Sequence, residues 1–207
     1  MNLHPLTLEG RHVRLAPMTR EHVPALWQAA SDPELWRWTV SRLRDEDDMR
    51  RYVEEALAAQ AQGTALPFVT TDAATGQVIG STRFANAEGP RVEIGWTWIA
   101  APWQRTAVNT EAKYLMMRHA FEALGLLRVE LKTDALNARS RAAILRIGAR
   151  EEGIFRKHLV TETGRVRDTV YFAVTDDEWP RVKARLEQML AAPRGGGMVA
   201  DLRNQAS

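Results

Sequence analysis

The chain has 207 residues, of which 45% are hydrophobic and 26% are charged, and its formal net charge is +2. This length supports one full-sized core, so we predict a single domain over 1–192 and a flexible, glycine-containing tail over 193–207. No apolar run reaches the roughly 18 residues of a membrane span, and the N-terminus lacks a secretory signal pattern. The absence of cysteine excludes disulfides and thiolate chemistry, and we expect a cytoplasmic protein.

The first half of the chain predicts one edge strand, two helices and three short antiparallel strands. The edge strand covers 12–15, and the helices cover 19–30 and 45–62. The three strands cover 66–71, 78–84 and 91–99, with turn residues between them. In the third strand, alternation places Val92, Ile94, Trp96 and Trp98 on one face and Glu93 on the other.

The second half alternates between helical and strand patterns. It predicts helices over 109–124, from Asn137 or Ser140 to Gly148, and over 175–190, with strands over 127–132, 152–160 and 167–174. The passage from 91 to 132 is a strand, a helix and a strand, which predicts one parallel crossover. We therefore expect one mixed α/β sheet with helices on both faces.

Charges are spread unevenly, with acidic residues gathered in 45–55 and basic residues after 139. A basic half is typical of a polyanion site or a nucleic-acid surface, and a solvated surface explains it equally well. No interleaving of aromatic and basic residues supports nucleic-acid binding, so we expect no nucleic-acid partner. The histidines lack metal-ligand spacing, so we also expect no metal.

The junction between the third strand and the following helix, 98–113, turns straight into the helix. Unpaired amides at the positive end of a helix form an anion site that suits a diphosphate. An ordinary helix start capped by Asn109 or Thr110 explains the same spacing.

This junction resembles the coenzyme A loop of GNAT acetyltransferases, whose usual pattern is Gln/Arg-x-x-Gly-x-Gly/Ala. Gln104 takes the first position, whereas Ala107 and Asn109 stand at the positions of the glycine and the small residue. Both are tolerated if the local dihedrals are helical. The likeness to the RimJ/RimL-like branch rests on Val-Glu-Ile-Gly-Trp at 92–96, Thr-Glu-Ala-Lys at 110–113, Asn-Ala-Arg-Ser at 137–140 and Gly148.

The resemblance covers roughly residues 8–176 and implies the GNAT-like acyl-CoA N-acyltransferase fold, a mostly antiparallel sheet of about seven strands with helices on both faces. In that family, the strand before the loop carries a bulge and splays from the next strand, and the pantetheine arm of acetyl-CoA lies in the opening. The implied cosubstrate is acetyl-CoA. The resemblance implies that the backbone of Trp98, Ile99 and Ala100 contacts the pantetheine arm and that one of these N–H groups polarises the thioester carbonyl. It implies that Asn137 also binds the coenzyme. The implied phosphate-binding residues are Gln104, Arg105, Thr106, Ala107, Val108, Asn109 and Thr110.

Acetyl transfer needs a base for the amine and a proton for the departing thiolate. The resemblance implies Glu93 as the base, acting through water, and a structural glutamate paired to an arginine is the alternative. Ile144 stands where many members have their acidic tyrosine, which leaves Ser140 as the candidate acid. The Ser140 hydroxyl equally fits a simple helix start. His158 and Tyr171 are also available as acids, although packing explains both.

We therefore expect an N-acetyltransferase acting on a primary amine, either a protein N-terminus or a small molecule. The alternative is a catalytically silent acyl-CoA-binding sensor or interaction protein with the same fold. The acidic cluster at 45–55 could attract a cationic amine, although a solvated helix face also explains it. A homodimer is compatible with the resemblance, and no membrane partner is expected.

Overall fold

The computed structural model describes residues 3–40 and 42–192, so the tail predicted over 193–207 lies outside the described residues. Its centre is an eight-stranded sheet in the order β1-β2-β3-β4-β5-β6-β8-β7. The strands are β1 (Leu8–Glu9), β2 (Val13–Pro17), β3 (Leu66–Asp72), β4 (Val78–Glu88), β5 (Arg91–Ile99), β6 (Arg128–Asp134), β7 (Arg150–Val160) and β8 (Val166–Thr175). The β5–β6 pair is parallel and the other pairs are antiparallel, which confirms the predicted crossover and the mixed sheet. The prediction of 12–15 as an edge strand was wrong, because β1 pairs outside β2.

Within the described residues, five α-helices accompany the sheet, at the places that the sequence predicts. They are α1 (Val23–Ala29), α2 (Glu46–Ala61), α3 (Val108–Arg118), α4 (Ala138–Arg146) and α5 (Trp179–Ala191). Short turns extend two of them, since a 3-10 turn at Arg20–His22 precedes α1 and a π turn at His119–Ala123 follows α3. Two further 3-10 turns lie at Pro33–Trp36 and Ala101–Trp103.

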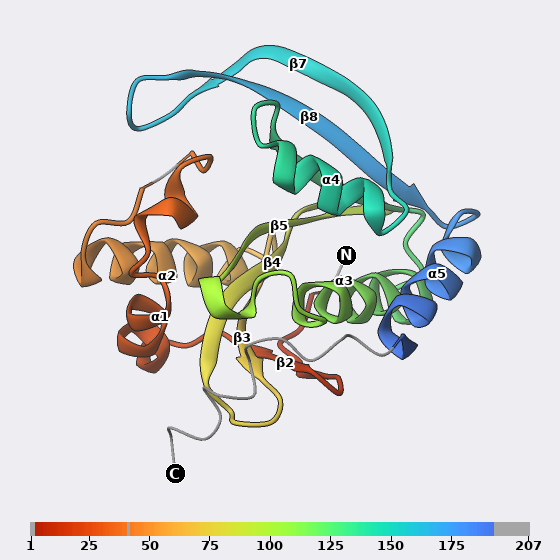
Figure 1. Cartoon of the computed structure of the whole chain (residues 1–207), viewed down its shortest axis with the longest axis horizontal. Helices are drawn as coiled ribbons and strands as arrows, with labels where there is room; N and C mark the ends of the chain where they lie inside the picture. Colours follow the sequence, from red (N-terminus) through yellow and green to blue (C-terminus); the bar gives the residue numbers. More distant parts are fainter. Residues whose placement is uncertain (1–2, 41, 193–207) are drawn as a thin grey trace.

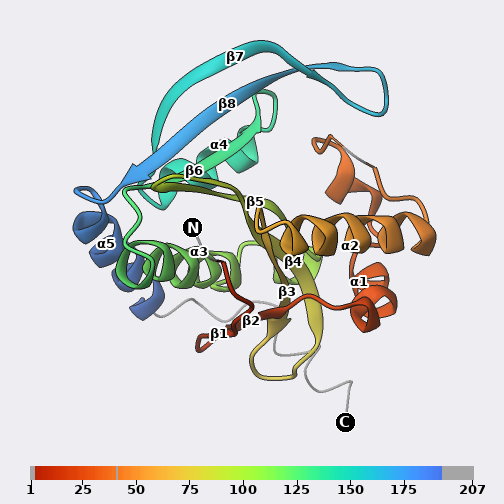
Figure 2. The ribbon, with the colours of Figure 1, turned by 180° about the vertical axis from the view of Figure 1, so that it is seen from behind.

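Two hydrophobic clusters lie on opposite faces of the sheet. One packs α3 and α5 against residues such as Phe84, Val92 and Phe172. The other packs α1 and α2 against residues such as Val69 and Trp98. Figure 1 and its reverse, Figure 2, show α1 and α2 on one side of the strands and α3 and α5 on the other, while the β7–β8 hairpin arches over α4.

Strand β5 contains a bulge at Trp96, the feature that the family resemblance implies. The register with β4 shifts between Ser81 and Arg83, and Trp96 has a φ of 48°. Because an extra residue in a strand turns the following side chains to the opposite face, Trp98 joins the α1–α2 cluster while Ile94 stays in the α3–α5 cluster. The prediction that Val92, Ile94, Trp96 and Trp98 share one face was therefore wrong.

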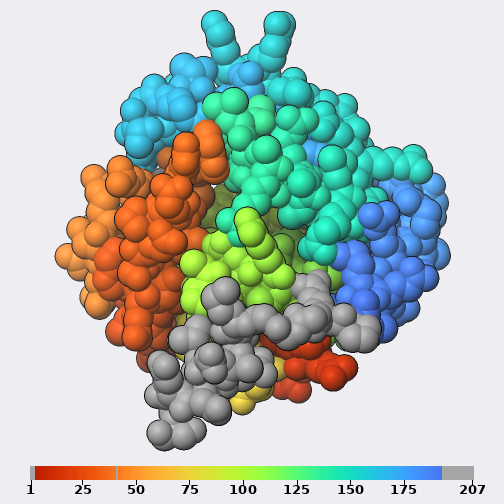
Figure 3. Space-filling view, in the orientation of Figure 1, coloured from red at the N-terminus to blue at the C-terminus, as the bar shows by residue number. Residues whose placement is uncertain are grey.

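Strands β5 and β6 separate soon after they meet. Their register covers three pairs, from Arg91↔Arg128 to Glu93↔Glu130, although β5 continues to Ile99 and β6 to Asp134. The space-filling view shows a recess in the middle of this face, between the orange N-terminal helical segment, the light green loop that follows β5 and the teal helix α4 (Figure 3). The opening of the sheet thus becomes a groove at the molecular surface.

Candidate active site

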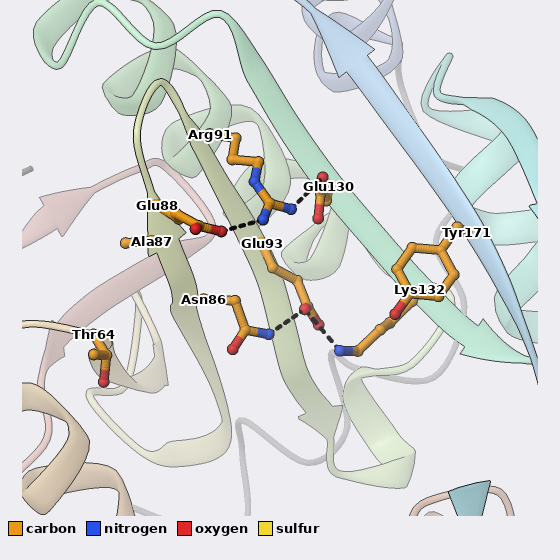
Figure 4. Close-up of a pocket in the computed structure, with 9 residues that line it drawn as sticks. All are labelled: Thr64, Asn86, Ala87, Glu88, Arg91, Glu93, Glu130, Lys132 and Tyr171. Carbon is orange, nitrogen blue, oxygen red and sulfur yellow. Dashed lines mark hydrogen bonds and ion pairs between the residues drawn. The ribbon is translucent and has the colours of Figure 1, made fainter. Parts of the chain in front are cut away.

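Glu93 lies on β5 at the last residue pair before the two strands separate, and only 3% of its side chain is exposed. Two donors hold its Oε2 atom, which is 2.7 Å from Asn86 Nδ2 and 2.8 Å from Lys132 Nζ. Figure 4 shows these side chains converging from β4, β5 and β6. The alternative interpretation was a structural glutamate paired to an arginine. Glu93 is indeed buried and ion-paired, but its partner is Lys132 and not an arginine.

The other carboxylate oxygen of Glu93, Oε1, lies over Gly95. A Cβ placed on Gly95 would be 2.7 Å from Oε1, closer than nonbonded atoms approach. Among residues 3–40 and 42–192, none donates a hydrogen bond to Oε1. Glu93 is therefore fixed through one oxygen, and the other can accept a proton from a water molecule or an amine.

Asn86 reaches Glu93 because β4 is longer than the sequence predicts. The sequence predicts a turn from Asn86 onward, whereas β4 continues to Glu88. Asn86 has a φ of 51°, within a register shift between Ala85 and Glu88. Asparagine tolerates this left-handed conformation better than most residues, which explains why the strand can bulge here and turn the amide toward Glu93.

A pocket of about 480 Å³ surrounds this carboxylate. Its lining consists of Thr64, Asn86, Ala87, Glu88, Arg91, Glu93, Glu130, Lys132 and Tyr171 (Figure 4). Arg91 is already paired with Glu88 and Glu130. The Lys132 ammonium lies 5.9 Å from the Tyr171 ring centroid. Charged groups of both signs therefore line the pocket around one buried carboxylate.

The predicted acid Ser140 lies apart from the residues that line this pocket. It sits in the first turn of α4, where its N–H donates to Asn137 Oδ1 at 3.0 Å. Asn137 is thus the N-cap of α4, a structural role that the prediction of a pantetheine contact did not include. Tyr171 does line the pocket, and its ring packs against Phe155 and His158.

The loop between β5 and α3 is built as the resemblance requires despite its missing glycines. Ala107 has helical dihedrals, with φ −70° and ψ −21°, as its tolerance at a glycine position requires. The left-handed residue of the loop is instead Arg105, with a φ of 64°. The N-cap residue Ala107 offers no capping side chain, and the first N–H of the helix, that of Val108, makes only a long hydrogen bond of 3.3 Å to Thr106 Oγ1. The start of α3 therefore keeps the features of an anion site.

The two sequence motifs of the predicted coenzyme site meet through Gln104. Its Nε2 donates to the Ile99 carbonyl at 2.7 Å, and its Oε1 accepts a hydrogen bond from Arg139 of α4. Gln104 therefore joins the end of β5 to α4 across the opening, a role that the sequence did not predict. Thr110 lies deeper, fully buried, and its hydroxyl accepts from Arg146.

The backbone at the end of β5 is partly occupied. Ala100 donates its N–H to the Ile79 carbonyl of β4 at 2.8 Å, so this N–H is not free for a ligand. Neighbouring residues of a strand direct their N–H groups to opposite sides. The N–H of Ile99 therefore points away from β4, toward the opening between β5 and β6.

Arginines pair with four of the six acidic residues in the cluster at 45–55. Asp45 caps α2, and the buried Asp48 is paired with Arg44 and Arg51. The N–H of Arg44 is the largest cause of the lowered pKa of Asp48, ahead of the guanidinium groups. The remaining pairs join Glu54 to Arg20, and Glu46 and Asp47 to Arg50. This surface thus has little unpaired negative charge to attract a cationic amine.

Sequence reasoning missed three polar residues of the site: Asn86, Lys132 and Arg139. Lys132 carried a signal, because it shares a strand face with Glu130, the parallel partner of Glu93. No sequence pattern indicated the contacts of Asn86 and Arg139. The contact of Asn86 depends on the bulge in β4, and that of Arg139 depends on where α4 lies across the groove.

The family model described as Acetyltransferase (GNAT) domain matches residues 12–150 of the chain. The chain belongs to the GNAT acetyltransferase family. The GNAT fold recurs in a GCN5-related N-acetyltransferase from Brucella melitensis, with a TM-score of 0.86 at 29% identity over 99% of this chain and 96% of that one. Among the residues that the structure describes, no helix is long and apolar enough to cross a membrane, and no acidic or histidine cluster could hold a metal ion.

Two further relatives refine the placement within the GNAT family. Mycobacterium smegmatis RimJ in complex with CoA-disulfide has a TM-score of 0.74 at 25% identity, over 86% of this chain and 88% of that one. The uncharacterized N-acetyltransferase YnaD of Bacillus subtilis is 22% identical over 155 residues, which are 75% of this chain and 88% of that protein. The likeness to RimJ supports the RimJ/RimL-like branch of the GNAT family.

Proposed function

We propose that this GNAT protein transfers the acetyl group of acetyl-CoA directly to a primary amine, which belongs to a protein N-terminus or to a small molecule. The observation that carries the proposal is Glu93, a buried carboxylate at the point where β5 and β6 separate, with one oxygen held and the other unbonded within the described chain. This is where a base must stand to act on an amine entering the groove.

The described residues fit the coenzyme. The start of α3, whose N-cap residue Ala107 offers no capping side chain, is suited to the diphosphate, and the opening beside the Ile99 N–H is suited to the pantetheine arm. Residues 104–110 would hold the phosphates, as a CoA-bound RimJ of similar fold supports. When bound, acetyl-CoA supplies an acetyl group as a thioester open to attack by an amine.

In the proposed reaction the amine nitrogen bonds to the acetyl carbon and the carbon–sulfur bond breaks. One proton must leave the nitrogen, and one must reach the sulfur. Glu93 accepts the first at Oε1, directly or through water, while Lys132 and Asn86 keep Oε2 in place. The Ile99 N–H is the donor that would polarise the thioester carbonyl.

Two side chains compete as the donor of the second proton. Ser140 was the candidate from sequence, whereas Tyr171 shares the pocket with Glu93, which supports Tyr171. Comparing Tyr171→Phe with Ser140→Ala at saturating amine separates the two candidates. Removing the acid lowers kcat, whereas removing a residue that only packs changes the stability of the protein and leaves kcat as it was.

We also propose that residues 1–192 form one acetyltransferase domain, which the continuous eight-stranded sheet supports. A cytoplasmic location and a homodimer stay predictions of the sequence.

The test is release of free thiol from acetyl-CoA across a panel of amines, from peptides with free N-termini to amino acids and polyamines, with mass spectrometry of the product. We expect one amine class to gain an acetyl group in step with thiol release. Calorimetric binding of acetyl-CoA without turnover of any amine would instead support the silent sensor.

A further inference from the structure

Arg83 is a buried cation beside the β5 bulge that the acetyl-transfer chemistry has not used. It lies on β4 opposite Gly95 of β5, and only 5% of it is exposed. Its guanidinium carbon lies 4.8 Å from the ring centroid of Tyr52 on α2 and 4.8 Å from that of Trp96 at the β5 bulge. Arg83 is thus enclosed between two aromatic rings.

Arg83 has no anionic partner within the described chain. Neither an ion pair nor a hydrogen bond joins its guanidinium to any of residues 3–40 and 42–192, and its buried Nε is unsatisfied. The other buried arginine, Arg167, lies 3.8 Å from the carboxylate of Asp134. Burial of an unpaired charge is costly, and two aromatic contacts offset only part of that cost.

The two Nη nitrogens of Arg83 are not fully buried as Nε is, so a ligand can reach them. Arg83 lies near the proposed catalytic residues. The Trp96 ring, 44% exposed, also lies 5.8 Å from Lys132 Nζ, which is paired with Glu93. One indole therefore separates Arg83 from the Glu93–Lys132 pair.

Other charges of the groove are already matched. Lys132 is occupied by Glu93, and Arg91 by Glu88 and Glu130. On α2, Glu46 and Asp47 pair with Arg50, Asp48 pairs with Arg44 and Arg51, and Glu54 pairs with Arg20. Of the two described cations that contact the Trp96 ring, Arg83 is the one without a carboxylate partner, so it is free to bind an anionic ligand.

We propose that Arg83 selects an acceptor amine that also carries a carboxylate. The planar guanidinium fork binds a carboxylate through parallel hydrogen bonds, and the flanking rings would exclude water from that contact. The carboxylate would rest at Arg83 and the amine would extend past Trp96 toward Glu93. This inference rests on the proposed acetyl transfer and narrows its substrate class.

The carboxylate has two sources, a free amino acid or an acidic side chain near a peptide N-terminus. The experiment compares matched pairs in both arms: amino acids against their primary amides, and peptides with Asp or Glu at the second position against Asn or Gln. Each pair is assayed for kcat/KM with the parent, Arg83→Met, Arg83→Lys and a control, Arg50→Met. Arg50 is an exposed arginine of α2 paired with acidic neighbours of the same helix.

We expect the parent to favour the acid over the amide by about tenfold or more in one arm, mainly through KM, as a charge-assisted contact predicts. Arg83→Met should reduce that ratio to about one while the amide substrate reacts as before, and Arg83→Lys should keep part of the ratio. Arg50→Met should keep the full ratio. Acetyl-CoA affinity should be equal in all four proteins, which separates this role from coenzyme binding.

Equal turnover of acids and amides by the parent, or a ratio unchanged in Arg83→Met, would overturn the inference while leaving acetyl transfer intact. If neither Arg83 variant folds, two measurements on the parent test the inference. One is its kcat/KM ratio for acid over amide substrates, and the other is competitive inhibition by the analogue of the substrate that keeps the carboxylate and lacks the amine. The inference is overturned if the parent shows no preference for acids over amides and is not inhibited by this analogue. A protein that acetylates no amine contradicts the proposed function itself.

Discussion

Gly95 leaves the space in which the Glu93 carboxylate lies, so a single methyl group there tests the site. In Gly95→Ala the new Cβ would meet Glu93 Oε1 at 2.7 Å, and the flexible side chain must move. We expect kcat to fall about tenfold or more, because misplaced groups lose their catalytic advantage steeply, while the melting temperature changes little. Gly153→Ala, where a Cβ meets nothing within 4 Å, is the control and should react as the parent does.

Lys113 is a buried lysine on α3, and its Nζ donates a 2.7 Å hydrogen bond to Thr97 Oγ1. Burial lowers the pKa of Lys113 to about 7 from its usual 10.5. Between those two pH values the unfolded chain binds the proton and the folded chain does not, so folding stability rises with pH through this window. Below it, both states are protonated and the folded state carries the full cost of a buried ammonium.

Lys113→Met should remove this dependence. Between pH 7 and pH 9 the free energy of unfolding of the parent should rise by about 2–3 kcal/mol more than that of the variant, at roughly 1.4 kcal/mol per pH unit. Urea unfolding at both pH values measures the difference. Lys183→Met, at a lysine whose pKa a hydrogen bond to Glu122 raises, serves as control. Parallel curves for the parent and Lys113→Met would show that the lysine is not titrating in the fold.

At the scale of elements, Glu111 fixes the N-terminal hairpin to α3. Its carboxylate accepts the N–H groups of Arg11, His12 and Val13 at 2.9, 2.6 and 2.9 Å, and Gly10 lacks the Cβ that would collide with it. In Glu111→Gln one carboxylate oxygen becomes an NH₂ group, which is a donor and therefore cannot accept from the backbone N–H groups that face it. We expect it to lower the free energy of unfolding by about 2–3 kcal/mol.

Denaturant unfolding measures the loss in Glu111→Gln, with the exposed Glu55→Gln of α2 as the matched control. A loss no larger than that of the control would mean that the hairpin holds its place without the carboxylate.

The sequence predicts the elements well and their faces less well. Helices α2, α3 and α5 have strong periodicity and clear ends, so each appears where it was expected. Strict alternation of faces predicts the wrong side for Trp98, because the residue inserted at the Trp96 bulge moves Trp98 into the α1–α2 cluster. The contacts of Glu93 follow from cross-strand register, which local sequence does not encode.

At the scale of the molecule, the opening between β5 and β6 should make coenzyme binding stabilise the whole fold. Ligand at about 100 times its dissociation constant adds about 2.7 kcal/mol, so acetyl-CoA should raise the melting temperature. Pantetheine without the phosphates should bind at least about tenfold more weakly, because the start of α3 then has no anion to bind. Equal affinity for the two would place the phosphates outside the 104–110 loop.

The most direct test of the account is the turnover of Glu93→Gln beside the parent with an accepted amine. Glutamine keeps the shape of the side chain but cannot take a proton. We expect kcat to fall by about a hundredfold or more, the usual contribution of a general base, while calorimetry gives the same acetyl-CoA affinity for both proteins. Full activity in the variant, with the coenzyme bound as before, would contradict the role of Glu93 and the account built on it.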